Sequence, residues 1–244
     1  MRGTMTVFRR ELAGYFGTPV AYVFLVIFLI LAGVFTWQLG GYYEMEQADL
    51  RGFFTFHPWL YLALIPALSM RLWAEERRSG TIEFLMTLPI STGGAVLGKF
   101  LAAWAFTGLG LVLTSTNWLT VNYLGEPDNG VILASYVGSF LMAGSFLAVG
   151  SALSALTKNQ VSAFVLTFTA SLLFVLAGFP AVTDAISGWA PEWFVASIRN
   201  LSFLDHFDAI TRGVVDARDV LYFLSVIALF LFGSAVIVDQ KKAD

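Results

Sequence analysis

Long uncharged stretches alternate with short charged segments along this chain. Six stretches contain no Asp, Glu, Lys or Arg, at residues 14–43, 52–70, 100–125, 129–157, 159–183 and 220–238. A helix needs about 20 apolar residues to cross the hydrocarbon core of a bilayer, and each stretch comes close to that length or exceeds it. We therefore predict six membrane spans, at about residues 18–40, 54–72, 95–122, 131–156, 160–180 and 219–239. The second span contains Pro58 and Pro66, so we expect it to be kinked.

The composition agrees with this pattern. Of the 244 residues, 57% are hydrophobic and only 13% are charged, whereas a soluble domain has about 25% charged residues. The sequence thus predicts an all-α integral membrane protein that forms one domain over residues 1–244. The chain has no cysteine, which excludes disulfides and thiolate metal ligands. Its net charge of −3 gives no basic footprint for nucleic acid.

Basic residues are divided unevenly between the two sides of the predicted bundle. If the N-terminus is inside, the inner segments hold ten basic residues and the outer segments hold four. Because cytoplasmic loops carry the excess of Lys and Arg, we expect both termini in the cytoplasm. The inner residues are Arg2, Arg9, Arg10, Arg71, Arg77, Arg78, Lys99, Lys158, Lys241 and Lys242, and the outer ones are Arg51, Arg199, Arg212 and Arg218.

Two segments are neither spans nor simple loops. Residues 1–17 place apolar side chains near one helical face and Arg9 on another, which is typical of a helix lying on the inner membrane surface. Residues 184–213 are too polar to span but rich in aromatic side chains, so we expect short re-entrant or interfacial helices on the outer face. Gly213 would end the last of these, and Asp216 would cap the final span.

Small residues recur at helical spacing in the fourth predicted span. They favour a close helix–helix seam, either within the fold or between two copies of the chain. The residues are Ser135, Ser139, Ala143, Gly150 and Ser154.

Motifs that would let the chain act alone are absent. It has no G-x-x-x-x-G-K-[ST] sequence and therefore no phosphate loop for ATP. The uncharged stretches place no Asp, Glu, Lys or Arg at mid-membrane depth, which argues against an ion-driven carrier. An intramembrane serine hydrolase would need Ser145 or Ser151 beside His57 or His206, and no spacing supports that pairing. Since two isolated histidines do not make a metal site, we expect no catalytic, cofactor or metal residues in the chain.

A charged island, residues 71–89, separates the second and third predicted spans. Gly80 permits a sharp turn, Thr81 can cap a short helix, and Pro89 would end it. These residues predict a helix at about 80–89 outside the membrane. The pattern alone leaves two interpretations open: an ordinary solvated loop, or a docking element for a partner that supplies energy.

The island resembles a known family. Residues 75–91, EERRSGTIEFLMTLPIS, are similar to the cytoplasmic loop of ABC-2 type transporter permeases, whose pattern is roughly E-E-K/R-x-x-G-T-x-E-x-L-L-x-x-P-x-S. Shorter strings within 10–22 extend the resemblance. Strings within 58–71 resemble the gliding-motility-associated branch, and residues 207–220, FDAITRGVVDARDV, are the string that points to this branch. Met86 stands where the family pattern has an aliphatic residue, a mild departure.

The resemblance implies a membrane subunit that is not itself an enzyme. The helix at 80–89 would be a coupling helix that packs into a separate cytoplasmic ATPase, and that ATPase would bind ATP and Mg²⁺. The resemblance also implies a second permease chain, alike or related, an accessory subunit with an extracytoplasmic domain, and export across the bacterial inner membrane in contact with its lipid. The expected coupling residues are Glu75, Glu76, Arg77, Gly80, Thr81, Glu83, Leu85 and Pro89, supported by Arg9, Arg10 and Glu11. A membrane scaffold without transport and the serine hydrolase are the alternatives.

Overall fold

Helices make up the fold. The computed structural model describes residues 2–42, 44, 48–82 and 90–241, and within these ranges there is no strand, as predicted. In chain order the helices are α1 (Arg2–Phe16), α2 (Pro19–Val34), the π-helical segment η1 (Phe35–Leu39), α3 (Arg51–Thr55), α4 (His57–Ser69), α5 (Arg71–Ser79), α7 (Thr92–Leu113), α8 (Ser115–Leu124), α9 (Asn129–Leu156), α10 (Gln160–Leu176), α11 (Pro180–Ser187), α12 (Glu192–Arg199), α13 (Phe203–Thr211) and α14 (Ala217–Gln240).

Most of the predicted spans correspond to long apolar helices. Among the described residues, four helices are long and apolar enough to cross a membrane: Ala21–Leu39, Thr92–Leu124, Asn129–Leu156 and Ala217–Gln240. Helices α10 and α11 add a fifth if they count as one broken span, bent by 72°. The predicted span at 54–72 does not qualify, so the predicted count of six is not reproduced. Its helix α4 has only 13 residues, because a turn interrupts the helix at Phe56 and another turn interrupts it at Met70.

Side chains set the start of the long helices. Ser91 and Asp128 accept hydrogen bonds from backbone N–H groups in the first turns of α7 and α9. Asn159 does the same for α10, and Asp216 for α14. Each oxygen satisfies a donor that the first helical turn leaves without a partner. The predicted cap at Asp216 is confirmed, and so is the turn at Gly213, where φ is +86°.

Helix α9 lies at the centre of the bundle. A Cβ added at Gly138 would come within 2.8 Å of Ile210 on α13, and one added at Gly144 within 2.9 Å of Trp104 on α7. A Cβ at Gly150 would collide with Ser69 on α4. The small residues predicted to form a seam are all buried within the chain. The seam therefore packs α9 against its own neighbours, as small residues do between membrane helices.

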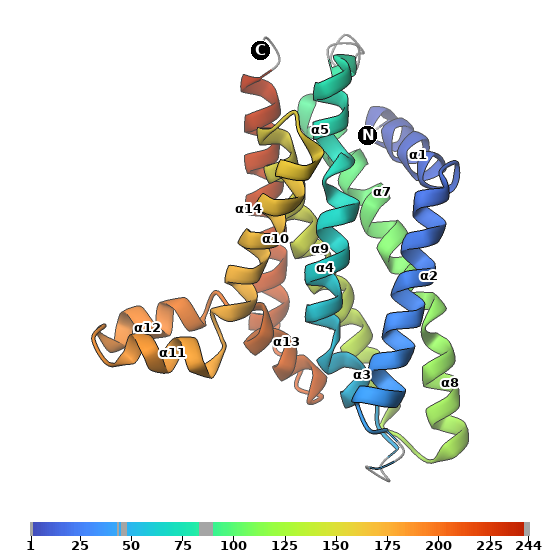
Figure 1. Cartoon of the computed structure of the whole chain (residues 1–244), viewed down its shortest axis with the longest axis vertical. Helices are drawn as coiled ribbons and strands as arrows, with labels where there is room; N and C mark the ends of the chain where they lie inside the picture. Colours follow the sequence, from blue (N-terminus) through green and yellow to red (C-terminus); the bar gives the residue numbers. More distant parts are fainter. Residues whose placement is uncertain (1, 43, 45–47, 83–89, 242–244) are drawn as a thin grey trace.

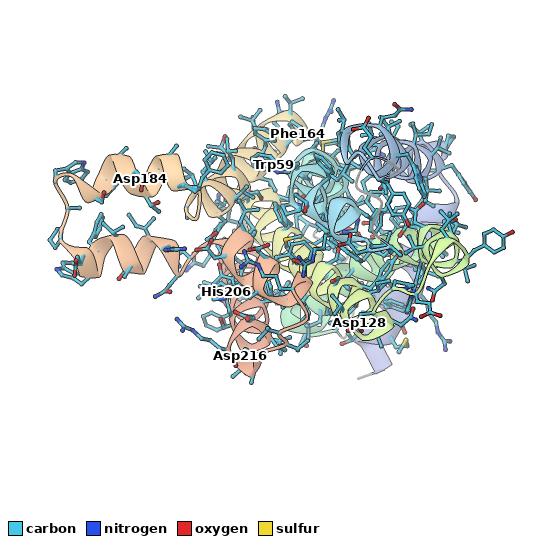
Figure 2. All side chains as sticks on the ribbon, turned by 90° about the horizontal axis from the view of Figure 1, so that it is seen from below. Trp59, Asp128, Phe164, Asp184, His206 and Asp216 are labelled. Atoms are coloured by element: carbon cyan, nitrogen blue, oxygen red, sulfur yellow. The ribbon has the colours of Figure 1, made fainter. Side chains whose placement is uncertain are left out.

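The bundle has two distinct ends. Both chain ends and α5 lie together at one end, while α3, α8 and α13 lie at the other (Figure 1). Helices α11 and α12 stand out sideways from the bundle, and Figure 2 shows this hairpin, with Asp184 labelled, away from the other helices. Neither α11 nor α12 has a buried residue, whereas α13 buries Phe203, Phe207 and Ile210. The predicted outer segment 184–213 is thus part projecting hairpin and part bundle.

Candidate functional site

The charged island begins with a helix that the sequence analysis did not predict. Residues 71–79 form α5, which ends at Gly80 with a φ of +71°, the left-handed conformation that favours glycine. The Ser79 hydroxyl donates to the Glu75 carbonyl at 2.9 Å and also lies 2.9 Å from the Thr81 hydroxyl. The predicted turn at Gly80 is therefore confirmed. Thr81 and Ile82 are again helical.

Three predicted coupling residues lie outside the described part of the chain. These are Glu83, Leu85 and Pro89, so the helix at 80–89 stays a prediction beyond Ile82. Arg9, Glu75 and Thr81 are exposed at the same end of the bundle as α5.

Four charged side chains join three helices at this end of the bundle. The Lys99 Nζ atom on α7 lies 3.2 Å from Glu11 Oε1 on α1 and 2.9 Å from Glu76 Oε1 on α5. Arg10 on α1 contacts the same two carboxylate oxygens, at 2.7 Å and 3.4 Å. We call Arg10, Glu11, Glu76 and Lys99 the four-charge cluster. The structure thus brings together three predicted site residues and adds Lys99, which the sequence prediction counted only as a loop charge.

Burial makes the cluster dependent on its pairing. The Lys99 side chain is only 3% exposed, and its Nζ atom sits 5.3 Å from the centre of the Trp73 ring. A buried ammonium is costly unless it is paired. Burial raises the pKa of Glu11, but the charges and hydrogen bonds of Lys99 and Arg10 outweigh this and leave the pKa below its ordinary value. The Glu11 carboxyl is therefore held in its charged form.

Close packing holds α1 against α7 beside the cluster. A Cβ added at Gly98 would come within 2.8 Å of the Thr4 carbonyl oxygen and of Val7 on α1. Val7 is buried there, and the Tyr15 ring stacks on Phe106 with centroids 5.0 Å apart. Part of the apolar face predicted to lie on the membrane therefore packs on α7.

A second set of contacts fixes α5 to the end of α9. Arg77 is buried, and its Nη1 atom donates to the Ala155 carbonyl oxygen at 2.8 Å. The Ser154 hydroxyl donates to the Met70 carbonyl oxygen at 2.9 Å and accepts from the backbone N–H groups of Trp73 and Ala74 at 3.1 Å. Arg77, predicted as a coupling residue, thus anchors the island from inside the bundle. These hydrogen bonds connect α5 directly to α9.

The residues considered for a serine hydrolase do not form that site. Ser145 donates to the carbonyl oxygens of Leu141 and Phe223, and Ser151 bonds to Trp73 and Ser234. The two histidines pair elsewhere: His57 Nδ1 lies 2.7 Å from Ser139 Oγ, and His206 Nδ1 lies 2.6 Å from Asp219 Oδ1. No group of three potential metal ligands occurs in the part of the chain that the structure describes.

Comparison with known proteins places the whole arrangement in one family. Residues 5–238 match the family model described as ABC-2 family transporter protein. The chain belongs to the ABC-2 transporter family. In this ABC-2 chain, the matched region contains most of α1, the island and all four residues of the cluster.

Two curated relatives carry a functional name. The chain is 29% identical over 181 residues to the probable multidrug ABC transporter permease YbhS of Escherichia coli strain K12, and equally to YbhS of strain O157:H7. The aligned region covers 70% of this ABC-2 chain and 46% of each relative. The match therefore spans less than half the length of these curated relatives.

Proposed function

We propose that the chain is the permease subunit of an ATP-binding-cassette transporter in a bacterial inner membrane. The observation that carries this proposal is the four-charge cluster, which links α1, α5 and α7 next to the Gly80 turn in a chain of the ABC-2 family. A separate cytoplasmic ATPase binds ATP and Mg²⁺ and docks on the helix at 80–89, with Glu75, Thr81 and Arg9 exposed beside it.

The contacts around the island support a mechanical mode of action. When the ATPase moves the helix at 80–89, the Gly80 turn carries the displacement to α5. From α5 it passes to α9 through Arg77 and to α1 and α7 through the four-charge cluster. Because packed helices move as rigid units, the result is a change of access between the two membrane faces.

Six spans with both termini in the cytoplasm belong to the same proposal. Helix α3 lies at the end of the bundle opposite to α5, so α3, α4 and α5 together carry the chain from one end to the other (Figure 1). Both termini lie at one end, as an even number of crossings requires. The excess of basic residues at that end favours the cytoplasm.

Export, dimerisation and the accessory subunit are finer parts of the proposal. The relatives' name, probable multidrug permease, supports outward transport. Two permease chains would form the pathway, in contact with membrane lipid, and a subunit with an extracytoplasmic domain would contact the outer end. Residues 207–220 remain the basis for assigning the chain to the gliding-motility-associated branch.

A cross-linking experiment tests the docking surface. Because the chain has no cysteine, Thr81→Cys gives it a single thiol. We expect a heterobifunctional cross-linker at position 81 to capture an ATPase subunit from the purified complex and to stop its ATP turnover. The matched control is Ser187→Cys on the projecting hairpin, which should capture no ATPase. Equal capture from both positions, or capture without any effect on turnover, would contradict coupling and favour a scaffold.

A further inference from the structure

A surface groove lies where the end of α1 meets the start of α2, next to the place where α4 meets α5. Two adjoining hollows, of about 190 and 160 Å³, share Tyr15, Thr18 and Arg71 in their walls. One continues between α2 and α4, and the other continues toward α5. Because they share three wall residues, we treat them as one surface and call it the elbow groove.

The two halves of the elbow groove differ in chemistry. The half between α2 and α4 is lined by apolar side chains, including Phe24, Ile27 and Ala67. Ile27 is 40% exposed on a helix long and apolar enough to span a membrane. The other half is bordered by the charged residues Arg71 and Glu75. The groove therefore joins an apolar half to a charged half, as a phospholipid joins acyl chains to a charged headgroup.

The charges at the polar end are available for a ligand. Arg71 is exposed and makes no hydrogen bond or ion pair with any described residue, and the Glu75 carboxylate is likewise without such a partner. Glu11 also borders this half, but its carboxylate is already held by Arg10 and Lys99. One free cation and one free anion thus lie four residues apart on α5. A guanidinium matches the geometry of phosphate, and a carboxylate accepts hydrogen bonds from an ammonium.

We propose that the elbow groove binds a phospholipid with a zwitterionic, ammonium-bearing headgroup of the phosphatidylethanolamine type. Arg71 holds the phosphate, Glu75 holds the ammonium, and one acyl chain lies between α2 and α4. The neighbouring carboxylate disfavours a purely anionic headgroup. The inference rests on the proposed placement of α5 at the inner membrane surface and not on docking of the ATPase. The lipid would occupy the joint at which α1 and α5 meet the spans.

Native mass spectrometry of the purified full-length chain in detergent tests this site. Dioleoyl phosphatidylethanolamine, dioleoyl phosphatidylglycerol and dioleoyl phosphatidylcholine are titrated separately. We expect wild-type protein to retain the ethanolamine lipid most strongly. Arg71→Gln should weaken its binding about fivefold, the effect of one basic side chain at a phospholipid surface. Glu75→Gln should abolish the preference for ethanolamine over glycerol, and Ala67→Trp should weaken binding of all three lipids by filling the apolar half.

Arg78→Gln is the matched control, because Arg78 is exposed on the same helix but does not line the groove. Equal effects of Arg71→Gln and Arg78→Gln on lipid binding would overturn the proposal. It would also be overturned if wild-type protein bound the glycerol lipid as strongly as the ethanolamine lipid, or more strongly. The titration uses no ATP and no ATPase. A failure of the coupling proposal would leave its result unchanged, and a failure of the lipid site would leave the cross-linking result unchanged.

Discussion

Lys99 links the helices at the end of the bundle that contains α5. Its ammonium group lies between the carboxylates of Glu11 and Glu76, which come from different helices. Two partly buried carboxylates that lie close together repel each other unless a cation separates them. Lys99 therefore allows the carboxylates of α1 and α5 to lie close together, because its ammonium group pairs with both.

We expect Lys99→Met to destabilise the protein by about 3 kcal/mol, near the lower end of the range for removing one partner of a buried ion pair, because Arg10 still contacts both carboxylates. Thermal unfolding in detergent measures the loss. The double variant Lys99→Met with Glu76→Gln should lose less stability than the sum of the two single losses, because it no longer places two unpaired carboxylates close together. Purely additive effects would show that the cluster is not an interacting unit.

The charge of Glu11 should make stability depend on pH. The pKa of this carboxyl in the folded chain lies below its ordinary value of 4.5, because Lys99 and Arg10 outweigh the effect of burial. A carboxyl with a lowered pKa stabilises the fold above the unfolded pKa, and this contribution is lost as pH falls through the folded pKa. Below about pH 4.5, we expect the midpoint temperature of unfolding to decrease with falling pH more steeply for wild type than for Glu11→Gln. Superimposable pH curves would contradict the assignment.

The sequence predicted three members of the cluster but not the fourth. Arg10, Glu11 and Glu76 are within strings that resemble the family, whereas Lys99 stands in a run of apolar and small residues at the start of a span. Its burial depends on the packing of α1 against α7 and on the Trp73 and Glu76 side chains that reach it from α5, tertiary contacts that local periodicity does not encode. Gly98, directly beside it, was the available signal, because a glycine inside a helix often marks a close approach.

At the scale of elements, the Gly80 turn separates the anchored helix α5 from the predicted coupling helix. Among the described residues, no atom outside the two chain neighbours lies within 4 Å of a Cβ added at Gly80, so the φ of +71° is the restriction that these residues place on position 80. We expect Gly80→Ala to cost about 1 kcal/mol through left-handed strain and to reduce stimulation of the partner ATPase, while Gly80→Asn is better tolerated. ATP turnover of the purified complex measures the coupling.

Gly93→Ala is the control for that substitution. A Cβ added at Gly93 likewise has none of the described side chains within 4 Å, but Gly93 lies in the first part of α7 and does not need a positive φ. Its replacement should leave turnover unchanged. If Gly80→Ala and Gly93→Ala behaved alike, the turn would not transmit the motion of the ATPase.

Element boundaries were predictable where a side chain caps a helix and less so where packing decides. Asp216 could be identified because an N-cap has a local sequence pattern. The division of the predicted span 54–72 into several helices could not be predicted. An uncharged run indicates a lipid environment, but it does not indicate whether the helix is continuous. Helix α4 is short and packs against α9, where the absence of a side chain at Gly150 makes room for Ser69. This packing compensates for the interrupted helical hydrogen bonds at the ends of α4.

At the scale of the whole molecule, the crossing made by α3, α4 and α5 decides the topology. If this segment crosses the membrane, Glu44 and Arg78 lie on opposite sides; if only the four long helices cross, they lie on the same side. Both residues are exposed, and the chain has no cysteine, so Glu44→Cys and Arg78→Cys each give one accessible thiol. In intact spheroplasts we expect a membrane-impermeant maleimide to label position 44, together with position 187 in Ser187→Cys, but not position 78. In inside-out vesicles the pattern should reverse. Labelling of 44 and 78 from the same side would remove the six-span topology, and with it the placement of the Gly80 turn opposite the projecting hairpin.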